Sequence, residues 1–175
     1  MTWTSDERVA KYTSWYAHKS IEDTKAYVGY MTNKKELSDY NWIIELDNKI
    51  IGSINVCYSN DYLEIAGIAY GKRVGDAFYI QVIVIKPKYQ HQHIGSRFID
   101  YYINYAKELE LTNIICEGVL VNNKMNIENL MKKYNFKEVM RIKEYWGYKF
   151  PNVWCKECDS NPCKCTNVIF VKKII

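Results

Sequence analysis

The segment that most constrains the fold is residues 83–96, IVIKPKYQHQHIGS, in which an apolar run passes through a polar loop into an amphipathic stretch. Pro87 has no N–H to donate to a β-ladder, so the strand is expected to end there. The polar residues that follow place several backbone N–H groups just ahead of a helix, where unpaired donors and the helix dipole favour an anion. The segment therefore predicts a phosphate-binding loop between a strand and a helix.

The hydrophobic pattern predicts an alternation of helices and strands around this loop. Two helices are expected first, at residues 6–18 and 20–31, the second opened by Ser20 and Asp23 in a variant of the capping box. Asp47 and Asn48 suit a tight turn between strands at 42–46 and 50–58. The other elements predicted are strands at 62–70, 77–85, 113–121 and 168–172, an extended run at 136–146, and a short helix at 127–134 ended by Asn135.

The helix that follows the loop has a clear apolar stripe. The positions expected to face the sheet are Ile94, Phe98, Tyr101, Tyr102 and Tyr105. The positions expected on the polar face are Ser96, Asp100, Asn104 and Lys107. The stripe predicts a helix packed on one face of the sheet.

Length and charge narrow the class of protein. A chain of 175 residues is long enough to bury one core, so residues 1–175 are expected to form a single domain. The net charge of +4 is mild and spread among mixed-sign segments, which argues against a nucleic-acid surface. No run reaches the roughly 18 apolar residues of a membrane span, and the N-terminus has no apolar signal-peptide core. A cytoplasmic location with no membrane partner is expected.

A cluster of cysteines, CKECDSNPCKC, lies near the C-terminus within the expected connection between the last two strands, as a Cys-rich loop at 155–165. In a reducing compartment the thiols of Cys155, Cys158, Cys163 and Cys165 favour a structural Zn²⁺ ion over disulfides. Reduced or oxidised cysteines without metal are the alternative. Cys57 and Cys116 fall inside strands and are expected to be buried as small apolar residues.

The order of these elements resembles the GNAT superfamily of acetyl-CoA-dependent N-acetyltransferases. Four segments carry the likeness: KIIGSI, VIVIKPKYQHQHIGS, LELTNI and NNKMNIENLMKKYNF. A weaker likeness, in VAKYTSWYAHKSIEDTKAYV, is to the ribosomal-protein N-terminal acetyltransferase branch. The resemblance implies an α/β (α+β) fold with a mixed, mostly antiparallel central sheet, helices on both faces, and a splay at the two central strands.

The resemblance also implies where acetyl-CoA, as co-substrate, binds. Gln90 and Gly95 match the phosphate-loop pattern of the superfamily, but His93 stands where its first glycine belongs. We expect a right-handed backbone at His93, which the start of a helix provides. By resemblance the pantetheine arm pairs with the strand and the loop N–H groups hold the phosphates. The residues implied in cofactor binding are Ile83, Val84, Ile85, Gln90, His91, Gln92, His93, Ile94, Gly95, Ser96, Asn122 and Asn123.

The catalytic residues are less clearly marked. Gln81 stands where some relatives carry a glutamate base, and it can only orient a water; Met131 stands where many carry the tyrosine that protonates the leaving thiolate. Glu117, inside the next strand, is the candidate base through water, with a plain sheet-edge or surface carboxylate as the alternative. The other candidates are Glu64 and Asp76 as bases, and Tyr134, Tyr145 and Tyr148 as acids.

Two classes of function follow from these residues. The first is an acetyl-CoA-dependent N-acetyltransferase in which a primary amine, on a small molecule or a protein N-terminus, attacks the thioester directly. The second is a catalytically degenerate CoA-binding module that senses metal or redox state, suggested by the two departures and the cysteines. His91 and His93 as metal ligands are a further alternative, disfavoured because no carboxylate or cysteine lies nearby in the sequence. Neither the acceptor nor the oligomeric state is marked by any motif.

Overall fold

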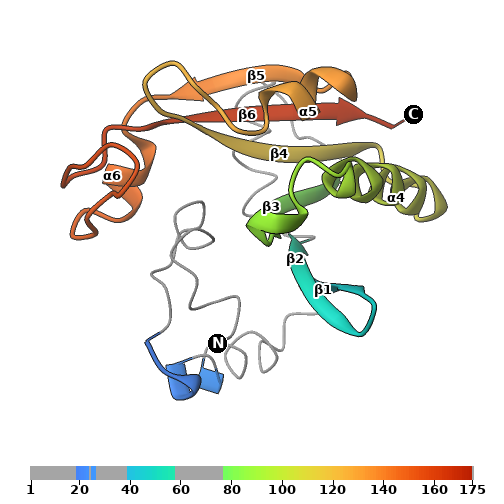
Figure 1. Cartoon of the computed structure of the whole chain (residues 1–175). Coiled ribbons are helices and arrows are strands. Elements are labelled where there is room, and N and C mark those ends of the chain that lie inside the picture. Colours follow the sequence, from blue (N-terminus) through green and yellow to red (C-terminus); the bar gives the residue numbers. More distant parts are fainter. Residues whose placement is uncertain (1–18, 24, 27–38, 58–76, 175) are drawn as a thin grey trace. The chain divides into compact units, whose positions relative to one another are not determined.

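The computed structural model describes residues 19–23, 25–26, 39–57 and 77–174. Their strands form one sheet in the order β1-β2-β3-β4-β6-β5 (Figure 1). β3 and β4 are parallel, whereas the β1–β2, β4–β6 and β5–β6 pairs are antiparallel, which confirms a mixed, mostly antiparallel sheet. The chain divides into two compact units, residues 1–57 with 81–97 and residues 58–80 with 98–175. The expected helix at 6–18 and strand at 62–70 lie outside the described residues.

The first unit contains the predicted hairpin. β1 (Asp39–Leu46) pairs with β2 (Lys49–Cys57), and Asp47 and Asn48 turn the chain at φ values of 50° and 56°. Two successive left-handed residues define the type I′ turn whose twist suits a hairpin. The predicted capping box is also present, because Ser20 Oγ accepts from the Asp23 N–H and Asp23 Oδ2 accepts from the Ser20 N–H, both at 3.0 Å.

The second unit contains most of the described core. The first half of β3 (Ala77–Ile85) pairs with β4 (Asn113–Leu120), and β4 pairs with β6 (Thr166–Lys173). The helix α4 (Ile94–Glu108) packs on this sheet through Tyr105, whose ring stacks on Phe78 at 5.6 Å. Tyr102 is buried as predicted. Tyr101 is 45% exposed, so the prediction that it faces the sheet was wrong. Ser96, expected on the polar face, is buried as well.

The C-terminal third holds one unexpected helix. α5 (Glu128–Lys133) ends as predicted at Asn135, whose φ of 56° is the left-handed conformation of a helix C-terminus. β5 (Lys137–Ile142) follows, but the extended run expected to reach Trp146 stops early, and α6 (Tyr145–Lys149) forms instead. Glu144, at φ 56°, breaks the strand direction and starts this helix. Within the described part of the chain, no helix has the length and apolar character that a membrane crossing requires.

Candidate functional site

The loop after β3 is fixed by side chains that bond back to its own backbone. A single 3₁₀ turn, η2 (Pro87–Tyr89), begins directly after the strand. The Gln90 side chain donates from Nε2 to the Ile85 carbonyl at 2.9 Å, and Gln92 Nε2 donates to the Lys88 carbonyl at 2.9 Å. Gln90 therefore has a bracing role in the loop that the sequence pattern alone did not reveal.

The backbone at His93 differs from the expectation. His93 has φ 61° and His91 has φ 60°, so both lie in the left-handed region, not the right-handed one. A glycine would adopt this conformation freely, and histidine is among the residues enriched there. The loop thus keeps the geometry that a glycine usually provides, at a cost of about 1–2 kcal/mol for each side-chain-bearing residue. The two imidazoles are exposed.

The chemistry of the loop fits an anion. His93 immediately precedes α4, whose first backbone N–H groups lie ahead of any intrahelical acceptor. The cationic side chains of Lys88 and Arg97 flank the loop and are exposed to solvent. Together with the positive end of the helix dipole, these groups form a setting for a phosphate or pyrophosphate.

The backbone of β3 is paired with β4 over only part of its length. The register runs from Ala77 opposite Asn113 to Ile80 opposite Cys116 and then ends. Residues 83–85, predicted to bind cofactor, lie beyond this point; Val84 is buried, and Ile83 and Ile85 are half-buried. The described pairing of β3 with β4 covers Ala77–Ile80 and does not include these three residues. Gln81 lies here too, but its side chain is outside the described residues.

Glu117 lies in the interior of the sheet on β4, not at a sheet edge. Parallel pairing places Tyr79 opposite Ile115, and antiparallel pairing places Asn167 opposite Val119, so both side chains share the face of Glu117. Burial raises the pKa of the Glu117 carboxyl above its usual value, and the nearby polar side chains of Tyr79 and Asn167 lower it only in part. The structure thus brings together three residues that are far apart in sequence.

Asn167 is the most unusual member of this group. Its side chain is fully buried, yet neither amide atom has a partner of full hydrogen-bond geometry in the described part of the chain. It is close enough to Glu117 to lower the pKa of that carboxyl. The positive charge of Lys149, on α6, also lowers the pKa of the Glu117 carboxyl. No sequence pattern marks Tyr79, Asn167 or Lys149 as neighbours of Glu117, because only the strand register and α6 bring them near it.

The remaining catalytic candidates separate into three groups. Glu64 and Asp76 lie outside the described residues. Met131 is 1% exposed and belongs to the core, so it takes no part in proton transfer. The three tyrosines differ in exposure: Tyr148 is 79% exposed, whereas Tyr134 and Tyr145 are half-buried. Nothing in their surroundings singles out one of them as the acid.

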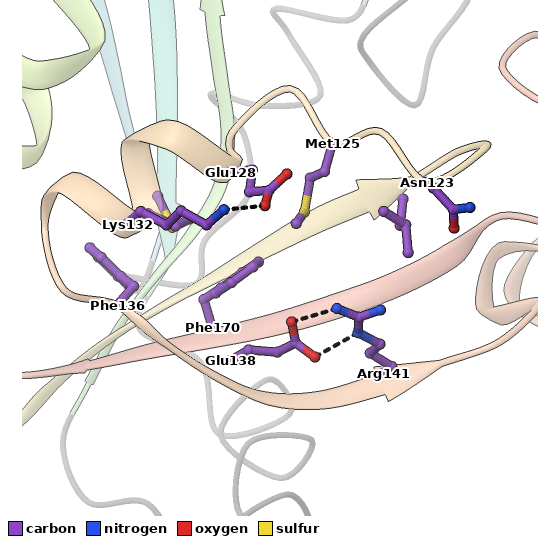
Figure 2. A pocket seen from close by; sticks show the side chains of 10 residues that line it. Asn123, Met125, Glu128, Lys132, Phe136, Glu138, Arg141 and Phe170 are labelled. Carbon is purple, nitrogen blue, oxygen red and sulfur yellow. Dashed lines mark hydrogen bonds and ion pairs between the residues drawn. The ribbon is translucent and has the colours of Figure 1, made fainter.

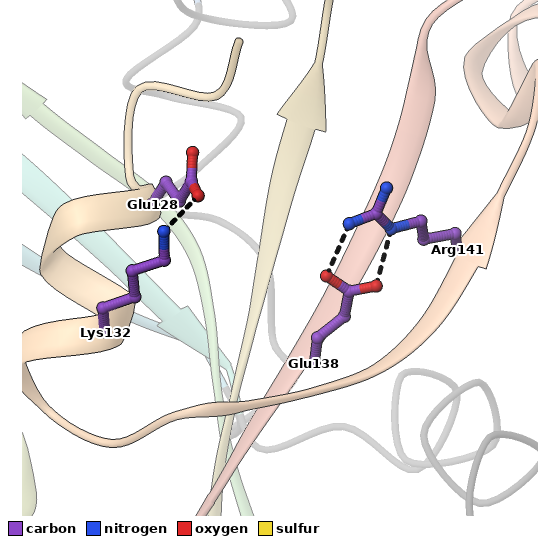
Figure 3. A network of polar contacts seen from close by, with 4 residues as sticks. All are labelled: Glu128, Lys132, Glu138 and Arg141. Atoms are coloured by element: carbon purple, nitrogen blue, oxygen red, sulfur yellow. Dashed lines mark hydrogen bonds and ion pairs between the residues drawn. The ribbon is translucent and has the colours of Figure 1, made fainter. Parts of the chain in front are cut away.

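Asn122 and Asn123 form a tight turn after β4. Their φ values are 48° and 61°, and Val121 and Lys124 exchange backbone hydrogen bonds across them at 3.0 and 2.8 Å. Asn123 also lines a pocket of ≈ 310 Å³ over α5, β5 and β6 (Figure 2). Two exposed ion pairs, Glu128 with Lys132 and Glu138 with Arg141, lie beside this pocket (Figure 3). The turn gives both asparagines a structural role, and their contact with a cofactor stays a prediction.

The four clustered cysteines converge in space. The Sγ atoms of Cys155, Cys158, Cys163 and Cys165 all lie within 4.8 Å of one another. Cys163 and Cys165 are buried, and the other two are half-buried. Burial opposes ionisation of Cys158, but hydrogen bonds from Ser160 and the Lys164 N–H lower its pKa to about 6. Burial raises the pKa of Cys163 to about 11. Cys116 is buried as expected, while the Cys57 side chain lies outside the described residues.

Solved structures of acetyltransferases share this fold. A GNAT family acetyltransferase from Elizabethkingia anophelis with acetyl-CoA bound superposes with a TM-score of 0.57 at 19% identity, covering 88% of this chain and 83% of that one. The ribosomal-protein-S18-alanine N-acetyltransferase from Escherichia coli gives 0.60 at 14% identity, covering 96% and 84%. A putative streptothricin acetyltransferase from Bacillus anthracis with acetyl coenzyme A gives 0.56 at 18%, covering 82% and 67%. At these identities the likeness establishes the fold.

The sequence itself matches the family model described as the Acetyltransferase (GNAT) family over residues 3–136. Among curated protein sequences, none matches this chain. The family match spans most of the chain and includes the loop, α4 and the strand that carries Glu117. The chain therefore belongs to the GNAT acetyltransferase family.

Proposed function

We propose that this acetyltransferase is a single-domain N-acetyltransferase that moves an acetyl group from acetyl-CoA to a primary amine, with Glu117 as the proton acceptor. The observation that carries the proposal is the position of Glu117, half-buried inside the sheet beside Tyr79 and Asn167, where burial raises the pKa of its carboxyl. A carboxylate with a raised pKa is a stronger base than one at the surface. An alkyl amine, with a pKa of about 10, is mostly protonated at neutral pH and must lose a proton before it attacks.

The loop and the strand before it supply the binding site for acetyl-CoA in this proposal. The N–H groups from Gln92 to Ser96 hold the pyrophosphate at the start of α4, and Lys88 and Arg97 add positive charge. The backbone of residues 83–85 pairs with the pantetheine arm as an added strand would. The proposal is supported by the left-handed φ of His93 and by the described pairing of β3 with β4, which covers only Ala77–Ile80.

The protein's own groups then do two things. Glu117 takes a proton from the amine, directly or through a water, and Tyr79 and Asn167 hold its carboxyl group in place. Acetyl-CoA supplies the thioester carbonyl that the amine attacks; the C–N bond forms, the C–S bond breaks, and CoA leaves as its thiol once protonated. Binding both reactants side by side supplies a further part of the rate.

The test is release of CoA thiol from acetyl-CoA in the presence of a panel of amines, amino acids, aminoglycosides and peptides. With an amine that the protein acetylates, Glu117→Gln should lower kcat/KM by about 10²- to 10⁴-fold. The matched control is Glu138→Gln, which removes an exposed carboxylate paired with Arg141 and should leave the rate unchanged. Binding of acetyl-CoA without thiol release for any amine would contradict the proposal, as would equal rates for the two variants.

The partners we propose are acetyl-CoA and either a small-molecule amine or a protein N-terminus. The E. coli neighbour acts on ribosomal protein S18, by its name, and the B. anthracis neighbour on streptothricin. Those two names span both classes of acceptor, so they support an amine substrate without choosing between them. A cytoplasmic location stays a prediction.

A second function is favoured by one observation, the convergence of the four cysteine Sγ atoms. We propose that they hold a structural Zn²⁺ ion as a resident cofactor. In a CoA-binding module without catalysis, this site would sense metal or redox state instead of supporting acetyl transfer. The two functions differ in the thiol-release assay, since only the enzyme consumes acetyl-CoA.

A further inference from the structure

We propose that the cysteine cluster is a tetrahedral Zn²⁺ site that braces the catalytic face, by fixing the start of β6 and α6 against Glu117; the role in catalysis rests on the proposed function. Three features support this site: the spacing of the Sγ atoms, the packing of the loop on α6, and the position of Asn167.

The Sγ spacing fits a zinc ion. A tetrahedral site with Zn–S bonds of about 2.3 Å has sulfur atoms about 3.8 Å apart. The Sγ atoms of Cys155 and Cys165 lie 3.7 Å apart, and those of Cys158 and Cys163 lie 3.9 Å apart. Disulfide-bonded sulfurs lie about 2.05 Å apart, far closer than these. Two Sγ pairs thus have the tetrahedral separation, and all four Sγ atoms lie within 4.8 Å of one another. A set of four thiolate ligands is typical of a closed structural zinc site.

Backbone hydrogen bonds hold the cysteine loop in a fixed conformation. Cys155 and Ser160 pair as a short antiparallel bridge, with N–H to carbonyl distances of 3.0 and 3.3 Å. The Lys164 N–H donates to Cys158 Sγ at 3.3 Å, and the Cys165 N–H donates to Cys163 Sγ at 3.4 Å. Backbone donors to ligand sulfurs orient them and compensate part of their negative charge. The loop therefore presents its ligands in a defined arrangement.

The cluster is connected to α6 by close packing at Gly147. A Cβ on Gly147 would lie 2.5 Å from the Cys163 carbonyl oxygen and 3.2 Å from its nitrogen, so only glycine lets the helix approach this closely. Two residues after Gly147, Lys149 places its positive charge in the surroundings of the Glu117 carboxyl. A ligand that fixes Cys163 therefore also fixes the helix that carries Lys149.

The cluster is connected to β6 through the chain itself. Cys165 immediately precedes the first residue of β6, and Asn167 is two residues beyond it. Asn167 is the fully buried amide that lies near Glu117 and has no other described partner. Loss of the metal would free the start of β6 and α6, and the groups that face Glu117 would lose their positions.

The metal itself is tested on the full-length protein prepared under reducing conditions. Elemental analysis should find one zinc per chain, and Cys163→Ser should abolish it, while Cys116→Ala, a buried cysteine outside the cluster, should keep it. A Co²⁺-loaded sample should show the visible absorption of a tetrahedral thiolate complex. Absence of zinc from the wild-type protein, iron in its place, or full zinc in Cys163→Ser would each overturn the site.

The brace is tested by hydrogen–deuterium exchange with and without a strong zinc chelator. Removal of zinc should speed exchange at least tenfold in residues 145–149 and 166–170 and leave residues 128–133 of α5 unchanged. Unchanged exchange in α6 and β6 would overturn the brace even with zinc present. Because zinc content and exchange do not depend on turnover, they hold or fail whether or not an amine substrate is found.

The role in catalysis has its own readout. With an acceptor in hand, the chelated protein should lose at least tenfold in kcat and shift the acid limb of its pH profile, with KM for acetyl-CoA within twofold. The expectation for KM follows from the proposed function, in which acetyl-CoA binds at the loop after β3 and not at the cluster. Unchanged kcat after complete zinc loss would overturn the catalytic role and leave the acetyltransferase proposal intact.

Discussion

Replacement of Gly147 by alanine tests the packing of α6 on the cysteine loop. The added Cβ would lie 2.5 Å from the Cys163 carbonyl oxygen, whereas ordinary contact begins at 3.4 Å. The backbone of α6 or of the cysteine loop must therefore move to relieve the overlap. Overpacking of this kind costs about 1–3 kcal/mol. Alanine recovers up to about 1 kcal/mol as a better helix former, and less in a helix as short as α6. We expect a net loss of about 1–2 kcal/mol.

A matched control is Gly118→Ala on β4. Its Cβ would meet Met125 Sδ at 2.3 Å, but a methionine side chain can rotate away, whereas a carbonyl in a folded loop cannot. Alanine is also favoured over glycine in a strand by about 0.5–1 kcal/mol. The unfolding free energy of this variant should stay within about 1 kcal/mol of the wild type.

Thermal unfolding monitored by circular dichroism is the assay, with zinc content measured on the same samples. For a chain of this length about 1 kcal/mol corresponds to 2–4 °C, so Gly147→Ala should lower Tm by about 2–8 °C and Gly118→Ala by less. Gly147→Ala should also bind zinc more weakly, because Cys163 must shift. An equal or larger loss of Tm in Gly118→Ala would refute the reasoning, as would a wild-type Tm and zinc affinity in Gly147→Ala.

Two further predictions concern the loop and the buried carboxyl. His93→Gly should stabilise the protein by up to about 1 kcal/mol, because relief of the left-handed strain exceeds the added entropy of the unfolded chain. His93→Ala should destabilise it. Denaturant midpoints that move in the same direction for both variants would contradict this. Glu117 has a raised folded pKa, so its contribution to stability is present below the unfolded pKa of about 4.3 and is lost as pH rises through the folded pKa. Glu117→Gln should therefore melt above the wild type at about pH 8, and the two should converge near pH 4; a wild type that is more stable at high pH would contradict the burial argument.

Most of the elements were predictable because their signals are local. The Asp47–Asn48 turn, the Ser20–Asp23 cap and the end of α5 at Asn135 each depend on side chains within a few residues of the backbone they shape. The cysteine cluster was predictable for the same reason, since a run of eleven residues holds all four cysteines. Failures occurred where a local conformation was set by the wider fold, as at His93 and at the start of α6.

The neighbours of Glu117 could not be predicted from the residues close to it in the sequence. The pattern placed Glu117 on a strand, but its partners come from β3, from β6 and from α6, and each depends on register or packing between distant segments. A shift of one residue in the β4–β6 register would turn Asn167 to the opposite face. No periodicity in the sequence fixes that register, so the neighbours of Glu117 could not be named from the sequence, and its role as a base stays a prediction.

The position of Glu117, half-buried inside the sheet, explains why the cysteine cluster would matter to the fold. A carboxyl group held away from water disfavours folding when it ionises, so the surrounding groups must be kept in place by something other than their attraction to it. Tyr79 is held by the paired half of β3, but Asn167 lies near the beginning of β6 and Lys149 on a one-turn helix, both positions where a strand or helix frays most easily. The residues that tether both of them are Cys163 and Cys165, through the Gly147 contact and through the chain. A metal bound there would stabilise the segments that carry Asn167 and Lys149 at once, and with them the surroundings of the Glu117 carboxyl.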